Sequence, residues 1–275
     1  MFQFYMPTKV IIGRECVVKE GHLLKGIGNK ALIVTGRYSA KKNGALKDVV
    51  KALEAQNMAY CVFDEVEENP SLETVEKAKN FGVAQGVDFV IGIGGGSPID
   101  ASKAIAVMLK HPELTGSTLI GTSLSSVPVI AVPTTAGTGT EVTQYAIVTD
   151  HQAKTKKNIG HTVFPQIAFV DAYYMKDMPK TITIHTAVDA MSHLVESYLS
   201  VKSNAVSEGF VVEGLKEWGK CIPQLLAGEF TLEGRECLMI ASMLAGMAIA
   251  QTGTSLPHGM GYALTSVSYT HLRAH

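Results

Sequence analysis

The sequence predicts an α/β domain built on a largely parallel sheet, followed by an all-α domain. Between residues 30 and 171, short β-branched runs alternate with amphipathic stretches of helical spacing. This alternation is typical of strand, helix, strand units with right-handed crossovers. Beyond about Lys176 the strand signal stops and long helical stretches follow. We therefore place one domain at residues 1–177 and the other at 178–275, with a boundary defined to within a few residues.

The elements follow from the spacing of apolar residues. The expected strands are residues 31–35, 60–63, 89–93, 129–132, 146–148 and 167–170. The expected helices of the first domain are residues 44–57, 71–86 and 97–110. Those of the second domain are residues 186–200, 207–226 and 232–253.

Composition and charge exclude some classes of partner. The net charge is −1 and the pI is near 6.8, whereas nucleic acids and anionic membranes call for clustered Lys and Arg. The longest apolar segment, residues 237–251, is shorter than the roughly 20 residues that cross a bilayer. The start lacks the pattern of a secretory signal, and the four cysteines are scattered without a C-x-x-C pair. We expect a cytoplasmic protein with reduced, inert thiols.

A glycine cluster marks the first candidate site. The stretch "GIGGGSPIDASKA" places Gly94, Gly95 and Gly96 between a strand and a helix, with Ser97 as the expected N-cap. Ligands of open α/β sheets sit at such strand ends, and a helix N-terminus suits a pyrophosphate. The alternative is a tight turn with no ligand. Asp100 and Lys103 share one side of the helix, where they could also form only a solvated ion pair.

A second small-residue cluster strengthens the nucleotide interpretation. The stretch "PTTAGTGTE" at residues 133–141 follows the strand "VIAV" and offers hydroxyl groups and exposed backbone. Two such loops after two parallel strands favour a dinucleotide over a generic turn.

A metal site is suggested further along the chain. Asp189 and His193 lie four residues apart in a helical pattern, so both face one side of the helix. His258 stands between a proline and a glycine in an apolar region. Taken singly, these residues could be a salt bridge and a core histidine. Together, three oxygen and nitrogen ligands without thiolate suit Fe²⁺, Zn²⁺ or Mn²⁺.

Several motifs in order carry a resemblance to a known family. They are "FYMPTKVIIG", "EENPSLETV", "GGGSPIDASKA", "PTTAGTGTEVT", "TAVDAMSHLVESYLS" and "LAGMAIAQTGTSLPHGMGY". The chain resembles the iron-containing (group III) alcohol dehydrogenases over nearly its whole length. That family shares its fold with glycerol dehydrogenases and dehydroquinate synthase. The resemblance implies a Rossmann-like nucleotide-binding domain, an all-α metal-binding domain and a homodimer.

The resemblance also assigns roles to residues. It implies that the pyrophosphate and nicotinamide side of the cofactor is bound by Gly95, Gly96, Ser97 and Asp100. It implies that the nucleotide cleft is completed by Thr134, Thr135 and Thr138, with Lys157 near the cofactor ribose. Asp189, His193 and His258 match three of the family's four metal ligands.

The C-terminal end departs from the family pattern. The family's fourth ligand is a histidine followed by glycine, whereas the matching position here is Leu272, with His271 one residue earlier. The last residues, "SVSYTHLRAH", match nothing expected of the family. We expect a truncated member that lacks the C-terminal helices, with His271 as the candidate fourth ligand. Some relatives carry a second histidine where Tyr262 stands, which makes Tyr262 a candidate for the substrate pocket.

The cofactor prediction rests on the residues after the strand "ALIVT". A carboxylate there would favour NAD through the ribose 2′-hydroxyl. Here Gly36 gives room for a 2′-phosphate, and Ser39 lies in a basic stretch, Arg37, Lys41 and Lys42, that attracts one. We predict NADP(H), with NAD(H) as the alternative.

These parts predict metal-dependent hydride transfer. The metal would be Fe²⁺, with Zn²⁺ as the alternative, and the substrates small primary alcohols, diols or aldehydes. A glycerol dehydrogenase-like enzyme and a catalytically incomplete, nucleotide-binding remnant are alternatives. A dehydroquinate synthase-like lyase would need a basic phosphate-binding cluster, and residues 189–260 show none. The physiological substrate, the reaction direction and the native metal stay open.

Overall fold

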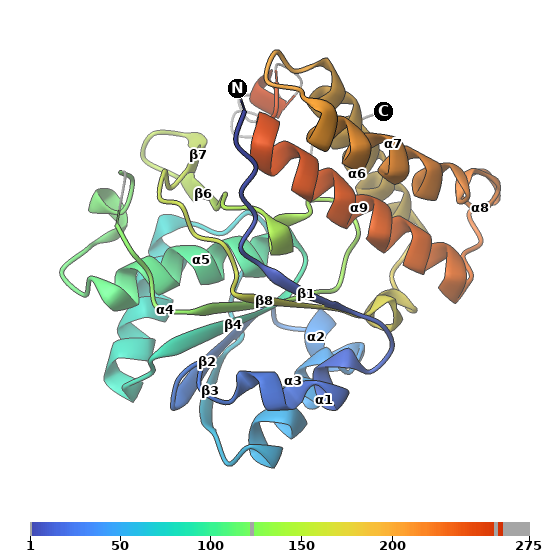
Figure 1. The fold of residues 1–275 in the computed structure, drawn as a ribbon. Coiled ribbons are helices and arrows are strands. Elements are labelled where there is room, and N and C mark those ends of the chain that lie inside the picture. The colour runs from blue at the N-terminus through green and yellow to red at the C-terminus, as the bar shows by residue number, and fades with distance from the viewer. Residues whose placement is uncertain (1, 122–123, 256–257, 261–275) are drawn as a thin grey trace.

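The computed structural model describes residues 2–121, 124–255 and 258–260. Its central feature is a six-stranded, all-parallel sheet with the strand order β1-β8-β5-β4-β2-β3 (Figure 1). The strands are β1 (Lys9–Ile12), β2 (Lys30–Thr35), β3 (Ala59–Phe63), β4 (Phe89–Gly94), β5 (Val129–Pro133) and β8 (Ile167–Val170). The parallel sheet that the alternating pattern predicted is therefore present.

Helices cover both faces of this sheet. One face packs on α1 (Cys16–Lys19), η1 (Gly21–Leu24) and α3 (Ala45–Ala55), and the other on α4 (Leu72–Gln85) and α5 (Gly96–Lys110). In β2, Leu32 and Val34 pack in the core with α4 and α5, whereas Ala31 and Ile33 pack in the core with α1, η1 and α3. Each strand thus sends alternate side chains to two cores, which explains its nearly continuous apolar sequence.

Capping residues fix the ends of the helices, but one predicted cap is not found. Ser71 caps α4 by accepting from Thr74 N at 3.1 Å, and Gly86 ends that helix in the left-handed region at φ 65°. Ser97 was expected to cap α5, and this is wrong. The helix starts one residue earlier with Gly95 as its N-cap, and Ser97 Oγ accepts from Asn69 N at 3.0 Å.

One predicted strand lies outside the main sheet. Residues 146–148 were expected to join the parallel sheet, but β6 (Ile147–Asp150) pairs antiparallel with β7 (Thr155–Asn158). The reason is packing: Ala146 and Val148 are buried in the core that includes α4 and α5, so their apolar surface is already covered. Neither β1 nor β7 was predicted, because β1 is a partly exposed edge strand and β7 is the polar sequence "TKKN".

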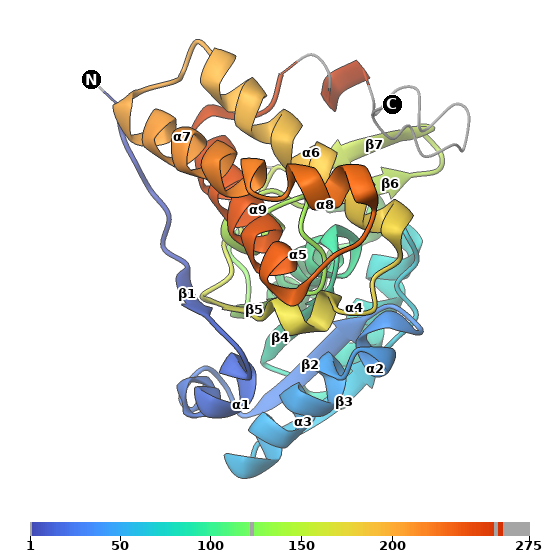
Figure 2. The same cartoon turned by 90° about the vertical axis from the view of Figure 1, so that its right-hand side faces the viewer.

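The second half of the chain is helical. Its helices are α6 (Lys180–Leu199), α7 (Ala205–Gly219), α8 (Ile222–Ala227) and α9 (Leu232–Thr252), which group on one side of the sheet (Figure 2). The single helix expected at 207–226 is two helices, because the chain breaks after Gly219 and Pro223 lies in the first turn of α8. Short elements complete the described fold: α2 (Ser39–Lys42), η2 (Gly116–Thr118), η3 (Thr140–Val142) and η4 (Ala172–Met175).

Helix α9 joins the helical half to the sheet. Its Leu238 and Met239 pack in one cluster with Ala131 of β5 and Ala168 of β8, while Ala245 packs on α6 and α7 in another. In the part of the chain that is described, none of the helices combines the length and apolar character that a bilayer crossing requires. The division at residue 177 stays a prediction.

The four cysteines carry free thiols. Cys16 and Cys221 are buried, and burial raises the pKa of each thiol to about 12. A thiol with such a pKa is almost entirely protonated near neutral pH and is a poor nucleophile.

Candidate active site

The strand order indicates where along the edge of the sheet a ligand would bind. The chain runs from β2 to β3 at one edge and then crosses to β4 on the other side of β2, so the order reverses between β2 and β4. Open α/β sheets bind ligands at the carboxyl ends of the strands at such a switch point. Gly36 follows β2 there, and the glycine loop, residues 94–97, ends β4 and begins α5.

The glycine loop packs against the loop that follows β5. We call residues 134–139 the threonine loop. Thr134 N donates to Gly94 O at 2.8 Å. A Cβ on Gly95 would lie 3.0 Å from Thr135 Oγ1, and one on Gly96 would lie 2.9 Å from Thr138 Cγ2. The two predicted clusters are therefore neighbours, and the chain itself already approaches these glycines closely enough to exclude side chains.

Asp100 and Lys103 are not a solvated surface pair. Lys103 is fully buried, and its Nζ donates to the carbonyl oxygens of Thr140, Thr143 and Tyr145 at 2.7–2.8 Å. Burial lowers the pKa of Lys103 to about 8. Asp100 accepts from Thr140 Oγ1 at 2.5 Å and from Ile147 N at 3.0 Å. These two side chains hold residues 140–147 in place, and cofactor binding by Asp100 stays a prediction.

The β6–β7 hairpin separates two adjacent lysines. Lys157 Nζ pairs with Asp150 Oδ2 at 3.0 Å. Lys156 Nζ instead donates to Asn69 Oδ1 at 2.7 Å, and Asn69 is the residue whose amide donates to Ser97 of the glycine loop. Lys156 was not singled out in the sequence. Adjacent side chains of a strand point to opposite faces, but no strand was predicted at residues 155–158.

A cavity of about 590 Å³ lies beside Gly36. Its lining residues are Arg37, Tyr38, Phe63, Glu65, Val66, Glu67, Thr74 and Lys77. Lys77 pairs with Glu65 at 2.6 Å, and Lys41 of the predicted basic stretch pairs with Asp64. Arg37 is thus the residue of that basic stretch that lines the cavity, while Ser39 is exposed at the start of α2.

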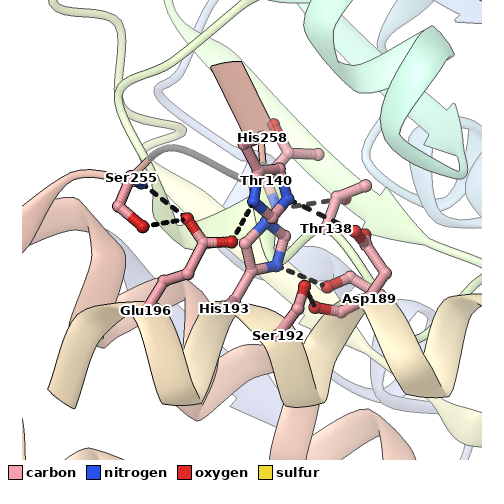
Figure 3. A network of polar contacts seen from close by, with 9 residues as sticks. Thr138, Thr140, Asp189, Ser192, His193, Glu196, Ser255 and His258 are labelled. Carbon is pink, nitrogen blue, oxygen red and sulfur yellow. Dashed lines mark hydrogen bonds and ion pairs between the residues drawn. The ribbon is translucent and has the colours of Figure 1, made fainter. Parts of the chain in front are cut away.

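The predicted metal ligands converge. Helix α6 presents Asp189 and His193 on one face, and His258 comes from the segment after α9 (Figure 3). One ligand atom of each of the three residues lies within 4.8 Å of the others. His258 Nε2 is 3.4 Å from Asp189 Oδ1, and the two imidazole rings stack with centroids 4.4 Å apart. We call these three residues the ligand cluster.

Hydrogen bonds orient both imidazoles. His193 Nδ1 lies 3.2 Å from the carbonyl oxygen of Gly137 and His258 Nδ1 lies 2.5 Å from Glu196 Oε1, which are both acceptors. With Nδ1 donating in each ring, the two Nε2 atoms are left for the shared position. Burial lowers the pKa of His193, which favours the neutral, metal-binding form. One carboxylate and two imidazole nitrogens fit a divalent iron or zinc ion.

Glu196 was missed at the sequence level. It follows His193 by three residues on α6, and that spacing was the signal that could have identified it. Desolvation alone would raise the pKa of Asp189, but the neighbouring imidazoles outweigh it and hold that pKa below its ordinary value. The carboxyl group is therefore ionised. His271 and Tyr262 lie outside the described residues, so the fourth ligand stays a prediction.

The threonine loop connects the two candidate sites. Thr138 packs against Gly96 at one end, and the carbonyl of Gly137, one residue earlier, orients His193 of the ligand cluster. A cofactor held at the glycine loop would therefore lie next to the threonine loop, the backbone segment that supports a metal ligand.

Comparison with known proteins gives a consistent assignment. The chain matches the family model of iron-containing alcohol dehydrogenase over residues 7–172 and the C-terminal model of that family over residues 183–272. A structure of an iron-containing alcohol dehydrogenase from Thermotoga maritima shares 43% identity and a TM-score of 0.92, over 98% of this chain and 75% of that one. The predicted fold class is confirmed.

Curated relatives add activities that are known for those proteins. The NAD-dependent methanol dehydrogenase of Bacillus methanolicus is 31% identical over 97% of this chain, and the NADPH-dependent butanol dehydrogenase of Clostridium saccharobutylicum 29% over 97%. A lactaldehyde reductase of Escherichia coli K12 is 32% identical over 86% of the chain. The chain spans 71%, 69% and 62% of the lengths of these three relatives. On these matches and on its fold, the chain belongs to the iron-containing alcohol dehydrogenase family.

Proposed function

We propose that the protein is a metal-dependent NAD(P)(H) alcohol dehydrogenase or aldehyde reductase that acts on small primary alcohols, diols or aldehydes. The observation that carries the proposal is the convergence of the ligand atoms of Asp189, His193 and His258 within 4.8 Å. Support comes from the threonine loop, which links that cluster to the glycine loop, and from relatives named as a methanol dehydrogenase and a butanol dehydrogenase.

Different groups of the chain would have different roles in the reaction. Asp189, His193 and His258 would hold a divalent cation, Fe²⁺ or alternatively Zn²⁺, which supplies Lewis-acid polarisation of a carbonyl or alcohol oxygen. The bound nicotinamide cofactor supplies the hydride chemistry. Backbone amides in the first turn of α5, which lack intrahelical acceptors, would face the cofactor's pyrophosphate. Gly137 and Glu196 keep the two imidazoles in the tautomer that leaves Nε2 available.

The proposal extends to partners and location. Four free thiols accord with a reducing compartment, so we propose the cytoplasm. We also propose a homodimer, which light scattering of the purified chain would test.

For the cofactor, we propose NADP(H) over NAD(H). Gly36 lies at the carboxyl end of β2, where an acidic side chain would repel a 2′-phosphate, and Arg37 lines the adjoining cavity. Replacing Gly36→Asp should shift the ratio of kcat/KM values toward NADH. A Cβ on Gly36 would lie 3.3 Å from Val66 O, so the unfolding midpoint of the variant should be recorded as well. An unchanged cofactor ratio in the folded variant would refute the preference.

The test of the whole proposal is NADPH oxidation with butyraldehyde by the purified chain after anaerobic loading with Fe²⁺. A metal-free sample and a sample loaded with Zn²⁺ are the controls. Metal-dependent turnover would support the dehydrogenase. NADPH binding without metal-dependent turnover would contradict it and indicate the nucleotide-binding remnant instead.

A further inference from the structure

We propose that Glu196 is a positioning residue that orients the imidazole of His258 and thereby sets the affinity of the ligand cluster for a divalent cation. The proposal rests on the metal site proposed above, and it assigns a role to a residue outside that cluster. Glu196 lies on α6, seven residues after Asp189 and three after His193. That spacing places all three side chains on one helix face.

The carboxylate of Glu196 is buried and fully engaged. Its relative exposure is 5%, which is low for an ionisable side chain. Oε1 accepts from His258 Nδ1 at 2.5 Å (Figure 3). Oε2 accepts from the backbone N of Ser255 at 2.6 Å and from Ser255 Oγ at 2.8 Å. Each contact is made to the segment after α9, which carries His258.

These contacts fix both the place and the tautomer of His258. Helix α9 ends at Thr252, and Gly253 follows with φ 73°, where the chain leaves the helix direction. Glu196 then ties Ser255 and His258 to α6. Because an ionised carboxylate only accepts hydrogen bonds, Nδ1 of His258 must carry the proton. In the neutral imidazole, the lone pair of Nε2 is then on the side of Asp189, whose Oδ1 lies 3.4 Å away.

Glutamine at position 196 separates this role from simple packing. It preserves the size of the side chain but replaces one acceptor oxygen with an NH₂ donor. If its oxygen faces His258, the NH₂ group opposes the Ser255 backbone donor. If its NH₂ group faces His258, Nδ1 must accept, and the proton moves to Nε2, the atom needed for the cation. In both arrangements cation binding is weakened.

The experiment measures cation affinity rather than turnover. The full chain and the variants Glu196→Gln, Ser255→Ala and Glu213→Gln are titrated with Co²⁺, with visible absorption and chelator competition as readouts. Glu213 is an exposed glutamate on α7 and serves as the matched control. We expect E196Q to weaken Co²⁺ binding by about 10- to 100-fold and to change the Co²⁺ absorption spectrum. S255A keeps the contact of Glu196 with His258 and should lose much less affinity, and E213Q none.

The outcomes separate this proposal from the proposed function. Failure of the wild-type chain to bind Co²⁺ would overturn the metal site itself. Wild-type binding with unchanged affinity and spectrum in E196Q would overturn only the role of Glu196. Should E196Q fail to fold, ¹⁵N spectra of the histidines in the Zn²⁺-loaded wild type show which nitrogen of His258 carries the proton. The His258 signal is assigned by its loss in His258→Asn. A proton on Nδ1 supports the proposal, and a proton on Nε2 overturns it.

Discussion

Two groups of ionisable side chains in this molecule differ in how their hydrogen-bonding atoms are used. In the first, which we call the loop clamp, Lys103 is surrounded by acceptors from residues 140–145 and lies near the charges of Asp100 and Glu141. In the second, the ligand cluster, a carboxylate oxygen and two imidazole nitrogens face one another.

The difference lies in the balance of donors and acceptors. The loop clamp carries its own cation, whose protons meet carbonyl oxygens at 2.7–2.8 Å, so it needs nothing from outside. When both imidazoles are neutral, the ligand cluster brings acceptors together, because the Nδ1 protons are directed to Gly137 and Glu196. A self-satisfied cluster supports the fold, whereas converging acceptors suit a bound cation. Three predictions test this contrast.

The largest effect is expected from Lys103→Met. The variant leaves the Asp100 carboxylate and three carbonyl groups without the buried ammonium. We expect the free energy of unfolding to fall by about 3–5 kcal/mol, a loss of the size seen when buried polar and charged groups lose their compensating charge. Urea unfolding measures this, with Lys110→Met, an exposed position on the same helix, as the control. Equal stability of the two variants would show that Lys103 does not support the fold.

The ligand cluster should respond in the opposite manner. In Asp189→Asn the ionised carboxylate is lost, so we expect Zn²⁺ affinity to fall on the order of 100-fold, or about 3 kcal/mol. The metal-free variant should unfold within about 1 kcal/mol of the wild type, because the Asp189 side chain is partly exposed and its contact with His258 Nε2 is long, at 3.4 Å. Chelator competition and urea unfolding in EDTA provide the two values. A large loss of metal-free stability would place Asp189 with the loop clamp.

The smallest effect concerns Glu141, which is 3% exposed on η3. Burial raises the pKa of its carboxyl from 4.5 to about 7, against the attraction of Lys103. Between these pH values the folded state binds more protons than the unfolded state, so the free energy of unfolding decreases as pH rises. In Glu141→Gln this contribution is absent, and the decrease between pH 4.5 and 7 should be smaller. Urea unfolding at pH 5 and at pH 7 measures the change for both proteins. An equal decrease in the free energy of unfolding in the variant and the wild type would refute the prediction.

Most of the strands that could be predicted are buried on both faces. The strands β2, β4, β5 and β8 are nearly continuous apolar runs, because their alternate side chains enter two cores, and the edge strand β3 was predicted from its apolar sequence. The edge strand β1 and the polar β7 carry no such signal. The N-cap prediction for Ser97 was wrong because its hydroxyl accepts a hydrogen bond from the backbone amide of Asn69, 28 residues earlier.

The candidate site was predicted where its spacing is local. Asp189 and His193 are four residues apart on α6, so helix geometry alone brings them together, whereas His258 was proposed from its local sequence and the family resemblance strengthened it. The roles of Glu196 and Lys156 depend on long-range contacts, to His258 and to Asn69. The burial of Lys103 likewise depends on the path of residues 140–145. Such contacts are set by tertiary structure, which no short sequence window contains.

The threonine loop has a thermodynamic consequence. It touches the glycine loop through Thr138 and supports His193 through the carbonyl of Gly137. In a protein that works as proposed, a nucleotide that shifts this loop would also change the position of a metal ligand. Linkage then requires reciprocity: whatever factor the nucleotide imposes on the dissociation constant of the cation, the cation imposes on that of the nucleotide.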